Sequence, residues 1–446
     1  MSAPPSAVSF GQALAFWLKL GFVSFGGPAG QIAIMHRELV ETRRWISERR
    51  FLHALNYCMV LPGPEAQQLA TYIGWLMHGT RGGIAAGALF VLPSLAILIA
   101  LSWAYLAFSH APLVAAILSG VKPAVVAIVI AATVRIGTRA LRHPFHVAIA
   151  VAAFLALAVF STPFPLVIAG AALAGVAGRR FVPKGPSHGA AAKARAREPA
   201  LIDDDTPAPA HAAASPRSFA IRLATGAALG LVPFAALVAV FGPGSDYPGM
   251  ARFFTQAALV TFGGAYAVLP YVVENAVVHF GWATMAQMID GLALGETTPG
   301  PLIMLVAFVG FVGGWTKELL GPGSLAAAGA LGAAVATWFT FLPSFVFILA
   351  GGPLVERTRG EVHLEGPLSA ITAAVVGVVA SLAVFFAWHV FWPGAGEAGS
   401  PAGPIDLVSV AIAAIALALL VGKRAGVVTV IAGSALAGVA LRSLGA

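Results

Sequence analysis

Charged residues are scarce in this sequence of 446 residues. Asp, Glu, Lys and Arg together make up 10% of it, whereas they make up about a quarter of a typical soluble protein. Hydrophobic residues make up 59%, and several apolar runs reach the roughly 20 residues that a helix needs to cross about 30 Å of hydrocarbon. The composition excludes an ordinary soluble protein and predicts an all-α polytopic membrane protein.

Cysteine is nearly absent as well, because Cys58 is the only one. A single cysteine excludes an internal disulfide and a cysteine-based metal cluster, and the sequence has no Walker-type G-x-x-x-x-G-K-[ST] motif. We therefore expect no bound metal, no cofactor and no enzymatic activity. The net charge of +8 could suit nucleic acid, but in a membrane protein it reports first on the side where Lys and Arg lie, so no nucleic-acid partner is expected.

Four glycine- and proline-rich breaks interrupt the apolar segments. They are Ser24-Phe25-Gly26-Gly27-Pro28, Pro62-Gly63-Pro64, Thr261-Phe262-Gly263-Gly264 and Thr298-Pro299-Gly300-Pro301. One offset relates the second pair to the first, since subtracting 25 from 262 or 62 from 299 gives 237, and Trp45 and Trp282 match at the same offset. Broken backbone is costly in a bilayer unless it lines a cavity. The repetition predicts two related halves with functional breaks, although a single break of this kind could be a kink with a packing role only.

The basic loops indicate how the broken segments sit in a membrane. If each segment is a re-entrant hairpin of two half-helices, a half of about 12 residues spans about 18 Å, which is just past the midplane. Twenty-one of the 26 Lys and Arg residues then fall on one side, which the positive-inside rule identifies as the cytoplasm. They lie in loops 36–50, 78–82, 135–143, 179–222, 356–359 and 423–424. The N-terminus and the central linker are expected on the same side.

An additional apolar span at 219–241 has no counterpart in the first half and would invert the second copy relative to the first. The expected architecture is a first transporter repeat at 1–178, a disordered cytoplasmic linker at 179–218 and a second repeat at 219–446. Each repeat would hold two broken hairpins and about four spanning helices. Inverted repeats with discontinuous helices near the midplane are the usual construction of a secondary transporter.

The breaks also predict the sign of the substrate. Pro28, Pro64 and Pro301 each follow a glycine, and proline is favoured in the first turn of a new helix; Gly264 would precede the fourth helix. Helix N-termini carry free N–H groups and a partial positive charge, which suit an anion. The polar side chains nearby suit a tetrahedral oxyanion, which needs many neutral donors. They are Ser24, Gln31, Thr261, Thr297 and Thr298.

Four charged residues in apolar segments, Glu65, Glu296, Lys19 and Lys122, are candidates for coupling or gating, and Asp290 is a further acid in an apolar segment. Glu65 and Glu296 lie beside breaks, and the hypothesis is that they exchange a proton during transport; alternatively, each caps a half-helix. Asp290 precedes the last break by about two turns. Lys19 and Lys122 could add positive charge to the site, or Lys19 could extend to the membrane surface.

Four stretches of the sequence resemble the chromate ion transporter family. They are SFGGPAGQIAIMHRELVETRRWISERRF, PGPEAQQLATYIGW, TFGG and TPGP. The resemblance covers both halves, as in long-chain, two-domain members, and implies a bacterial inner-membrane protein that exports chromate and so confers chromate resistance, with sulfate as a close structural analogue. The motif residues that it assigns are Phe25, Gly26, Gly27, Pro28, Gln31, Trp45, Pro62, Gly63, Pro64, Glu65 and Gln68.

The second copy departs from this pattern. It has no proline after Phe262-Gly263-Gly264, it has VVHFGWAT in place of the basic loop, and Leu302 stands at the position of Glu65. The two halves are therefore not expected to contribute equally to binding.

Physical chemistry also favours one direction of transport. A dianion that leaves a cell with a negative interior releases about 4.6 kcal/mol per 100 mV, so export needs no ATP. Two alternatives remain: uptake of sulfate or a related oxyanion on the same scaffold, and a non-transporting membrane scaffold or receptor, against which the paired breaks argue. Small-residue stretches at 170–178 and 426–438 could pack helices or the subunits of a homo-oligomer.

Overall fold

The chain is an all-α polytopic membrane protein, as the composition predicts. The computed structural model describes residues 7–25, 27–109, 111–178, 199–207, 209–213, 215–357, 365–392 and 404–443. Within these ranges every named element is a helix. Five helices are long and apolar enough to cross a membrane, namely α4, α5, α8, α13 and α14, and several shorter apolar helices accompany them.

The first half holds seven α-helices. They are α1 (Phe10–Val23), α2 (Gly27–His36), α3 (Glu48–Val60), α4 (Glu65–Ala107), α5 (Pro112–Ala140), α6 (Pro144–Ala158) and α7 (Phe164–Ala177), with the π-helical η1 (Arg37–Thr42) after α2. The helix α4 contains a kink at His78 and Gly79, where the glycine has φ +64°. A short non-helical segment at 159–163 separates α6 from α7.

The second half holds nine α-helices. They are α8 (Pro216–Phe241), α9 (Asp246–Leu259), α10 (Ala265–Glu274), α11 (Met285–Thr297), α12 (Leu305–Thr316), α13 (Leu325–Arg357), α14 (Glu365–Phe391), α15 (Leu407–Val421) and α16 (Val427–Ser443). The π-helical η5 (Asn275–His279) follows α10, and the 3-10 turns η6 (Leu302–Met304) and η7 (Pro322–Ser324) flank α12.

Helix bounds recur at the offset found in the sequence. Both ends of α3 and α11 differ by 237 residues, and each helix begins behind a hydroxyl N-cap, Ser47 or Thr284, whose side chain accepts from a backbone N–H three residues later. A side-chain oxygen at this position satisfies an N–H group that a helix leaves unpaired. The π-helices η1 and η5 also occupy related positions. Trp45 and Trp282 follow these π-helices and are both buried.

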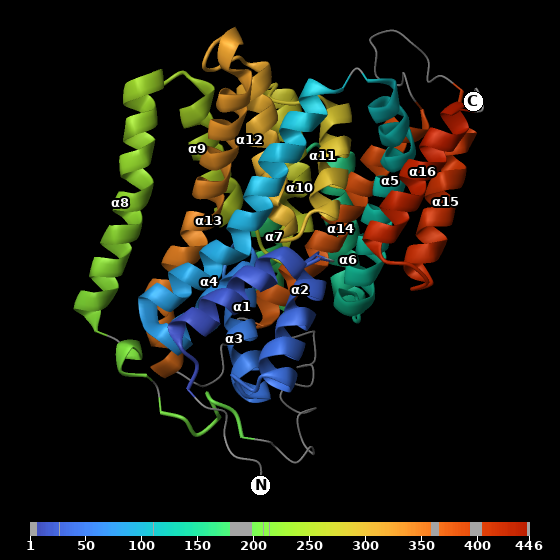
Figure 1. Cartoon of the computed structure of the whole chain (residues 1–446). Helices are drawn as coiled ribbons and strands as arrows, with labels where there is room; N and C mark the ends of the chain where they lie inside the picture. Colours follow the sequence, from blue (N-terminus) through green and yellow to red (C-terminus); the bar gives the residue numbers. More distant parts are fainter. Residues whose placement is uncertain are drawn as a thin grey trace.

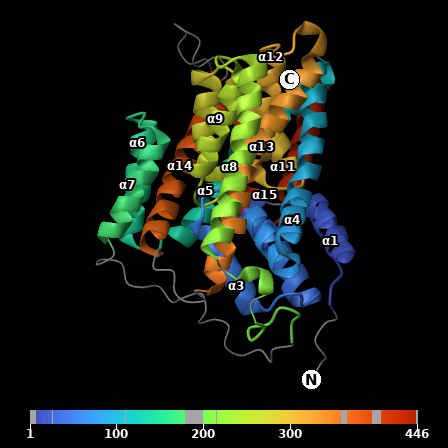
Figure 2. The ribbon, with the colours of Figure 1, turned by 90° about the vertical axis from the view of Figure 1, so that its left-hand side faces the viewer.

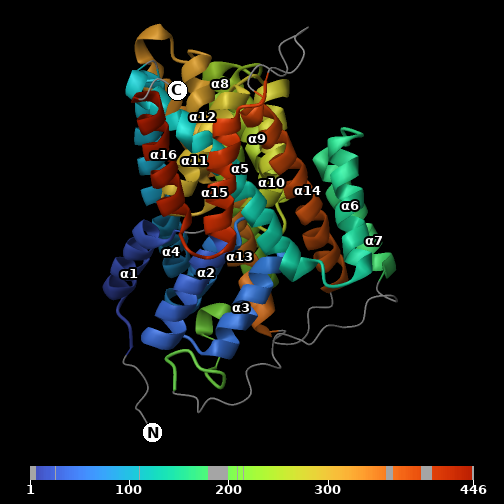
Figure 3. The same cartoon turned by 90° about the vertical axis from the view of Figure 1, so that its right-hand side faces the viewer.

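The two sets of short helices lie in opposite halves of the molecule. Figure 1 shows α1, α2 and α3 in the lower half, near the N label, and α9, α10, α11 and α12 in the upper half, while α8 runs nearly the full height between the two levels. The pair α6 and α7 packs against α14 at one side (Figure 2). On the other side, α15 and α16 pack against α5 (Figure 3). The breaks at the ends of the short helices therefore meet in the middle of the molecule.

Several basic loops gather at the end that carries the N label. Leu201 and Ile202 donate their backbone N–H groups to the carbonyls of Arg44 and Trp45, at 2.9 and 3.0 Å, and His211 contacts the carbonyl oxygen of Trp75 at 2.8 Å. Residues 199–207 and 209–213 belong to the linker expected to be disordered, and they contact the basic loop, where Ile202 is buried beside Ile46. Residues 179–198, 208 and 214 of this linker lie outside the described residues, and 216–218 belong to α8.

Candidate functional site

The four breaks contact one another through two reciprocal backbone hydrogen bonds. The N–H of Gly63 donates to the carbonyl of Thr261, and the N–H of Gly300 donates to the carbonyl of Ser24, both at 2.8 Å. The offset of 237 converts each of these bonds into the other, because Gly63 corresponds to Gly300 and Ser24 to Thr261. Both glycines have positive φ angles, +119° and +101°, a region that L side chains rarely adopt. Each half therefore supplies partners for the broken backbone of the other.

Four helices begin at these breaks. They are α2 at Gly27, α4 at Glu65, α10 at Ala265, and α12, which follows η6 behind Pro301. The first turns of α2 and α10 face each other, since a Cβ placed on Gly264 would lie 3.7 Å from Cγ of Pro28. Their unpaired N–H groups and partial positive charges consequently lie in one region. This convergence suits an anion.

Two glutamines of the first half donate hydrogen bonds at the breaks. The Nε2 of Gln31 donates to the carbonyl of Gly300 at 2.5 Å, and the Nε2 of Gln68 donates to the carbonyl of Pro62 at 2.7 Å and to Oγ of Ser344 at 3.2 Å. Both side chains are buried. Their Oε1 atoms have no hydrogen-bond partner within the part of the chain that the structure describes.

The hydroxyl groups near the breaks fall into two classes. Those of Thr261, Thr297 and Thr298 donate to carbonyls of their own helices, at 2.6, 2.9 and 3.0 Å, so they differ from the free donors that the sequence suggests. The hydroxyl of Ser24 is buried and has no partner among the described residues. Leaving a buried polar group unpaired costs about 1–3 kcal/mol, which makes Ser24 a candidate donor to a substrate.

The other motif residues are placed unevenly. Gly27, Gly263 and Gly264 have positive φ angles and form the bends of their breaks, whereas Phe25 is exposed on the outside. Gly26 lies outside the described residues.

Two of the charged candidates lie beside the breaks. Glu65 opens α4 and is partly buried, and the buried Glu296 in the last turn of α11 accepts a hydrogen bond from the hydroxyl of Tyr266 on α10. Lys19 is on the exposed face of α1 and makes no described contact with a break. Lys122 pairs instead with Asp290, at 3.7 Å from its Oδ2 atom.

A buried ion pair near the basic end joins the two halves. Nη1 of Arg50 on α3 lies 2.9 Å from Oε2 of Glu356 on α13, and the side chains are only 6% and 1% exposed. The hydroxyl of Tyr72 donates to Oε1 of the same carboxylate at 2.5 Å.

A second ion pair joins the halves nearer the opposite end. Asp290 on α11 pairs with Lys122 on α5 and accepts a hydrogen bond from Tyr105 on α4 at 2.9 Å. Because α11 corresponds to α3 at the offset of 237, the acid of this cluster and the base of the first lie on related helices. Lys122 and Asp290 are predicted from the sequence as charged candidates, whereas Arg50, Tyr72, Tyr105 and Glu356 are not. Glu356 could have been found from the sequence, because it is an acid near the end of an apolar helix.

A basic cavity of about 410 Å³ lies between α5 and the α15–α16 connection. Arg135, Lys423 and Arg424 supply its charge. The cavity therefore places positive charge at the basic end.

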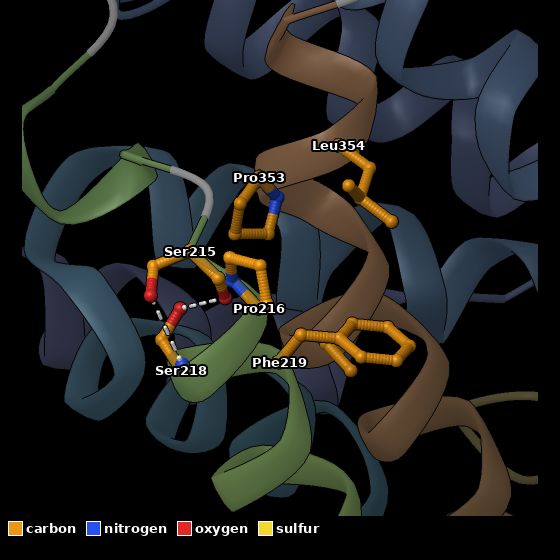
Figure 4. A pocket seen from close by; sticks show the side chains of 7 residues that line it. Ser215, Pro216, Ser218, Phe219, Pro353 and Leu354 are labelled. Carbon is orange, nitrogen blue, oxygen red and sulfur yellow. Dashed lines mark hydrogen bonds between the residues drawn. The ribbon is translucent and has the colours of Figure 1, made fainter.

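A second cavity, of about 210 Å³, lies between the start of α8 and the end of α13 (Figure 4). Its lining is mostly apolar and includes Phe219, Pro353 and Leu354. The hydroxyl of Ser218 donates to the carbonyl of Ser215 in the same turn, at 2.9 Å. This cavity has neither charge nor contact with a break, so it does not resemble an anion site.

Comparisons with known proteins agree with the geometry. The family model described as "Chromate transporter" matches residues 11–176 and 249–439. A chromate transport protein of Pseudomonas aeruginosa is 34% identical over 86% of this chain and 82% of its own length, and one of Cupriavidus metallidurans is 26% identical over 96% and 92%. A probable chromate transport protein of Synechococcus elongatus is 29% identical over 85% and 84%.

No solved structure matches the chain. The family model covers both halves and includes all four breaks, and the relatives match over most of their length. This chain therefore belongs to the chromate transporter family.

Proposed function

We propose that the chain is a secondary transporter that exports chromate across the bacterial inner membrane and so confers chromate resistance. The family consists of transport proteins rather than enzymes, and the relatives named above are chromate transport proteins. The observation that carries the proposal is the pair of reciprocal hydrogen bonds, Gly63 to Thr261 and Gly300 to Ser24. They bring four helix N-termini together, and such termini bind anions.

The proposed orientation places the basic end in the cytoplasm. The loop of Arg44 contacts residues 201–202, Arg50 pairs with Glu356, and Arg135 shares a cavity with residues 423–424. Excess Lys and Arg mark the cytoplasmic side. In this frame α1–α3 form hairpins that enter from the cytoplasm and α9–α12 form hairpins that enter from outside, which makes the halves inverted repeats meeting near the midplane.

The membrane potential would then drive the transport. A dianion that moves outward across 100 mV, negative inside, gains about 4.6 kcal/mol, or 2.3 kcal/mol for each charge. This supports an outward gradient of more than about a thousandfold at equilibrium. The basic cavity with Arg135 lies on the side from which the anion would enter.

Flux of radiolabelled chromate into or out of oriented proteoliposomes tests the proposal. We expect flux from the cytoplasmic face outward, with a rate that rises with an imposed interior-negative potential and persists in excess sulfate. Flux abolished by sulfate would identify sulfate or a related oxyanion as the substrate instead. Absence of flux under every gradient would contradict a transport function and favour a scaffold or receptor.

We further propose that the two inter-half ion pairs close the two ends of the transporter. The Arg50–Glu356 pair links α3 to α13 near the cytoplasmic end, and Asp290 links α11 to α4 and α5 nearer the outer end. Removing one partner of a buried ion pair costs roughly 3–5 kcal/mol. Loss of either pair should therefore destabilise the closed state of its own end only.

Modification of the native Cys58 reports on the cytoplasmic end. This residue is buried on α3, the helix that carries Arg50. In Glu356→Gln we expect an impermeant maleimide to modify Cys58 from the cytoplasmic face several-fold faster than in the wild type. Asp290→Asn is the matched control, because it removes a buried charge at the other end, and its rate should stay near the wild-type value. Equal acceleration in both variants would indicate general destabilisation and would contradict the proposal that each ion pair closes its own end.

Glu65 and Glu296 are proposed to carry protons coupled to transport. Each lies beside a break, and Glu296 accepts a hydrogen bond from Tyr266. An ionised carboxylate next to a bound dianion would repel it, so binding favours the protonated acid.

Substitution of Glu296 separates coupling from structure. Glu296→Gln cannot titrate but keeps an acceptor for Tyr266, so we expect the pH dependence of chromate flux between pH 5 and 8 to flatten, and likewise for Glu65→Gln. Tyr266→Phe removes the hydrogen bond and leaves the carboxyl group, so its flux should still depend on pH. If both glutamine variants keep the wild-type pH profile, proton coupling by Glu65 and Glu296 is wrong, and capping of the half-helices explains their positions.

A further inference from the structure

Two buried serines of the spanning helices lie against the breaks. Ser94 on α4 and Ser344 on α13 each follow a proline, and both are 0% exposed. A Cβ placed on Gly300 would lie 2.7 Å from Cβ and 3.0 Å from Oγ of Ser94, and one placed on Gly63 would collide with Oγ of Ser344. Each hydroxyl thus lies against one of the two glycines that donate the reciprocal hydrogen bonds. It fits there only because glycine has no side chain.

The hydroxyl of Ser94 is unpaired within the described part of the chain. A serine inside a helix commonly donates to the carbonyl four residues earlier, as Thr340 does to Ala336 at 2.7 Å. The Oγ of Ser94, in contrast, has no hydrogen-bond partner in the ranges that the structure covers. The Oγ of Ser344 accepts from Gln68 at 3.2 Å, and its own hydrogen is available to another acceptor.

We propose that Ser94 and Ser344 donate hydroxyl hydrogen bonds to the transported oxyanion. This inference rests on the proposed function and adds to its site two residues that lie outside the broken segments. A buried hydroxyl hydrogen next to converging helix N-termini is a neutral donor, which an oxyanion needs in number. Ser94, Ser24 and the N–H groups of the breaks then form one donor set.

The contacts of the two serines are reciprocal, like the hydrogen bonds between the breaks. Ser94 of the first half faces Gly300 of the second, and Ser344 of the second half faces Gly63 of the first. In this structure Gln68 engages Ser344, while Ser94 has no partner among the described side chains. Ser94 is therefore the donor that is free for substrate in this state, and its removal should have the larger effect.

Chromate flux by Ser94→Ala and Ser102→Ala proteins tests the inference. Ser102 is a matched control because it lies about 12 Å further along α4, is also buried, and also has an unpartnered hydroxyl among the residues described. We expect Ser94→Ala to raise the chromate concentration at half-maximal flux about tenfold, as for loss of one hydrogen bond to a charged group, while the maximal rate changes less. Ser102→Ala should match the wild type.

Two further variants separate binding from packing. Ser94→Thr keeps the hydroxyl and should restore much of the affinity, and Ser344→Ala should weaken binding by a smaller factor. Chromate-dependent thermal stabilisation of the purified proteins gives a second readout that needs no flux.

The outcomes distinguish this inference from the proposed function. If the wild type transports chromate and Ser94→Ala behaves like Ser102→Ala, the serine role is wrong and the transport function stands. If size-exclusion chromatography shows that Ser94→Ala does not fold, the other two variants test the inference. The inference is wrong if Ser344→Ala binds chromate with wild-type affinity and Ser94→Thr, which keeps the hydroxyl, does not regain that affinity. A wild type that neither transports nor binds chromate overturns the proposed function itself.

Discussion

Broken backbone inside a membrane protein needs hydrogen-bond partners, and the rest of this structure depends on how they are supplied. Hydrocarbon offers none, so each unpaired group would cost several kcal/mol. Here Gly63 donates to Thr261 and Gly300 donates to Ser24, so each half satisfies the breaks of the other. The reciprocal contacts between the halves therefore satisfy backbone groups at both pairs of breaks.

The same contacts explain how a closed site could open. A pair of hydrogen bonds and two ion pairs, one toward each end, join the halves in addition to the packing of their helices. All of these contacts cross between halves, so relative movement can break those at one end while those at the other persist. Transporters built from inverted repeats work through such movements around a central site.

The sequence predicts the breaks and their register because glycine, proline and tryptophan recur at one offset, and the helix bounds of α3 and α11 follow it. It does not predict the partners of the breaks, since Ser94 and Gly300 are far apart in the chain and only folding brings them together. Local hydrogen bonds also change the prediction. Thr261 is expected from the sequence as a free donor, but its hydroxyl donates to the carbonyl of Ala257. Arg50 belongs to a basic run that indicates topology, and its buried pairing with Glu356 depends on a helix from the other half.

Labelling of two related positions tests the inverted arrangement most directly. Glu41 and Val278 lie 237 residues apart in the two π-helices, with side chains 61% and 79% exposed respectively. Glu41→Cys and Val278→Cys, each in a Cys58→Ala background, would be treated with an impermeant maleimide from either face of oriented vesicles. We expect Glu41→Cys to react only from the cytoplasmic face and Val278→Cys only from the outer face. Reaction of both from the same face would contradict inverted repeats and the midplane site built on them.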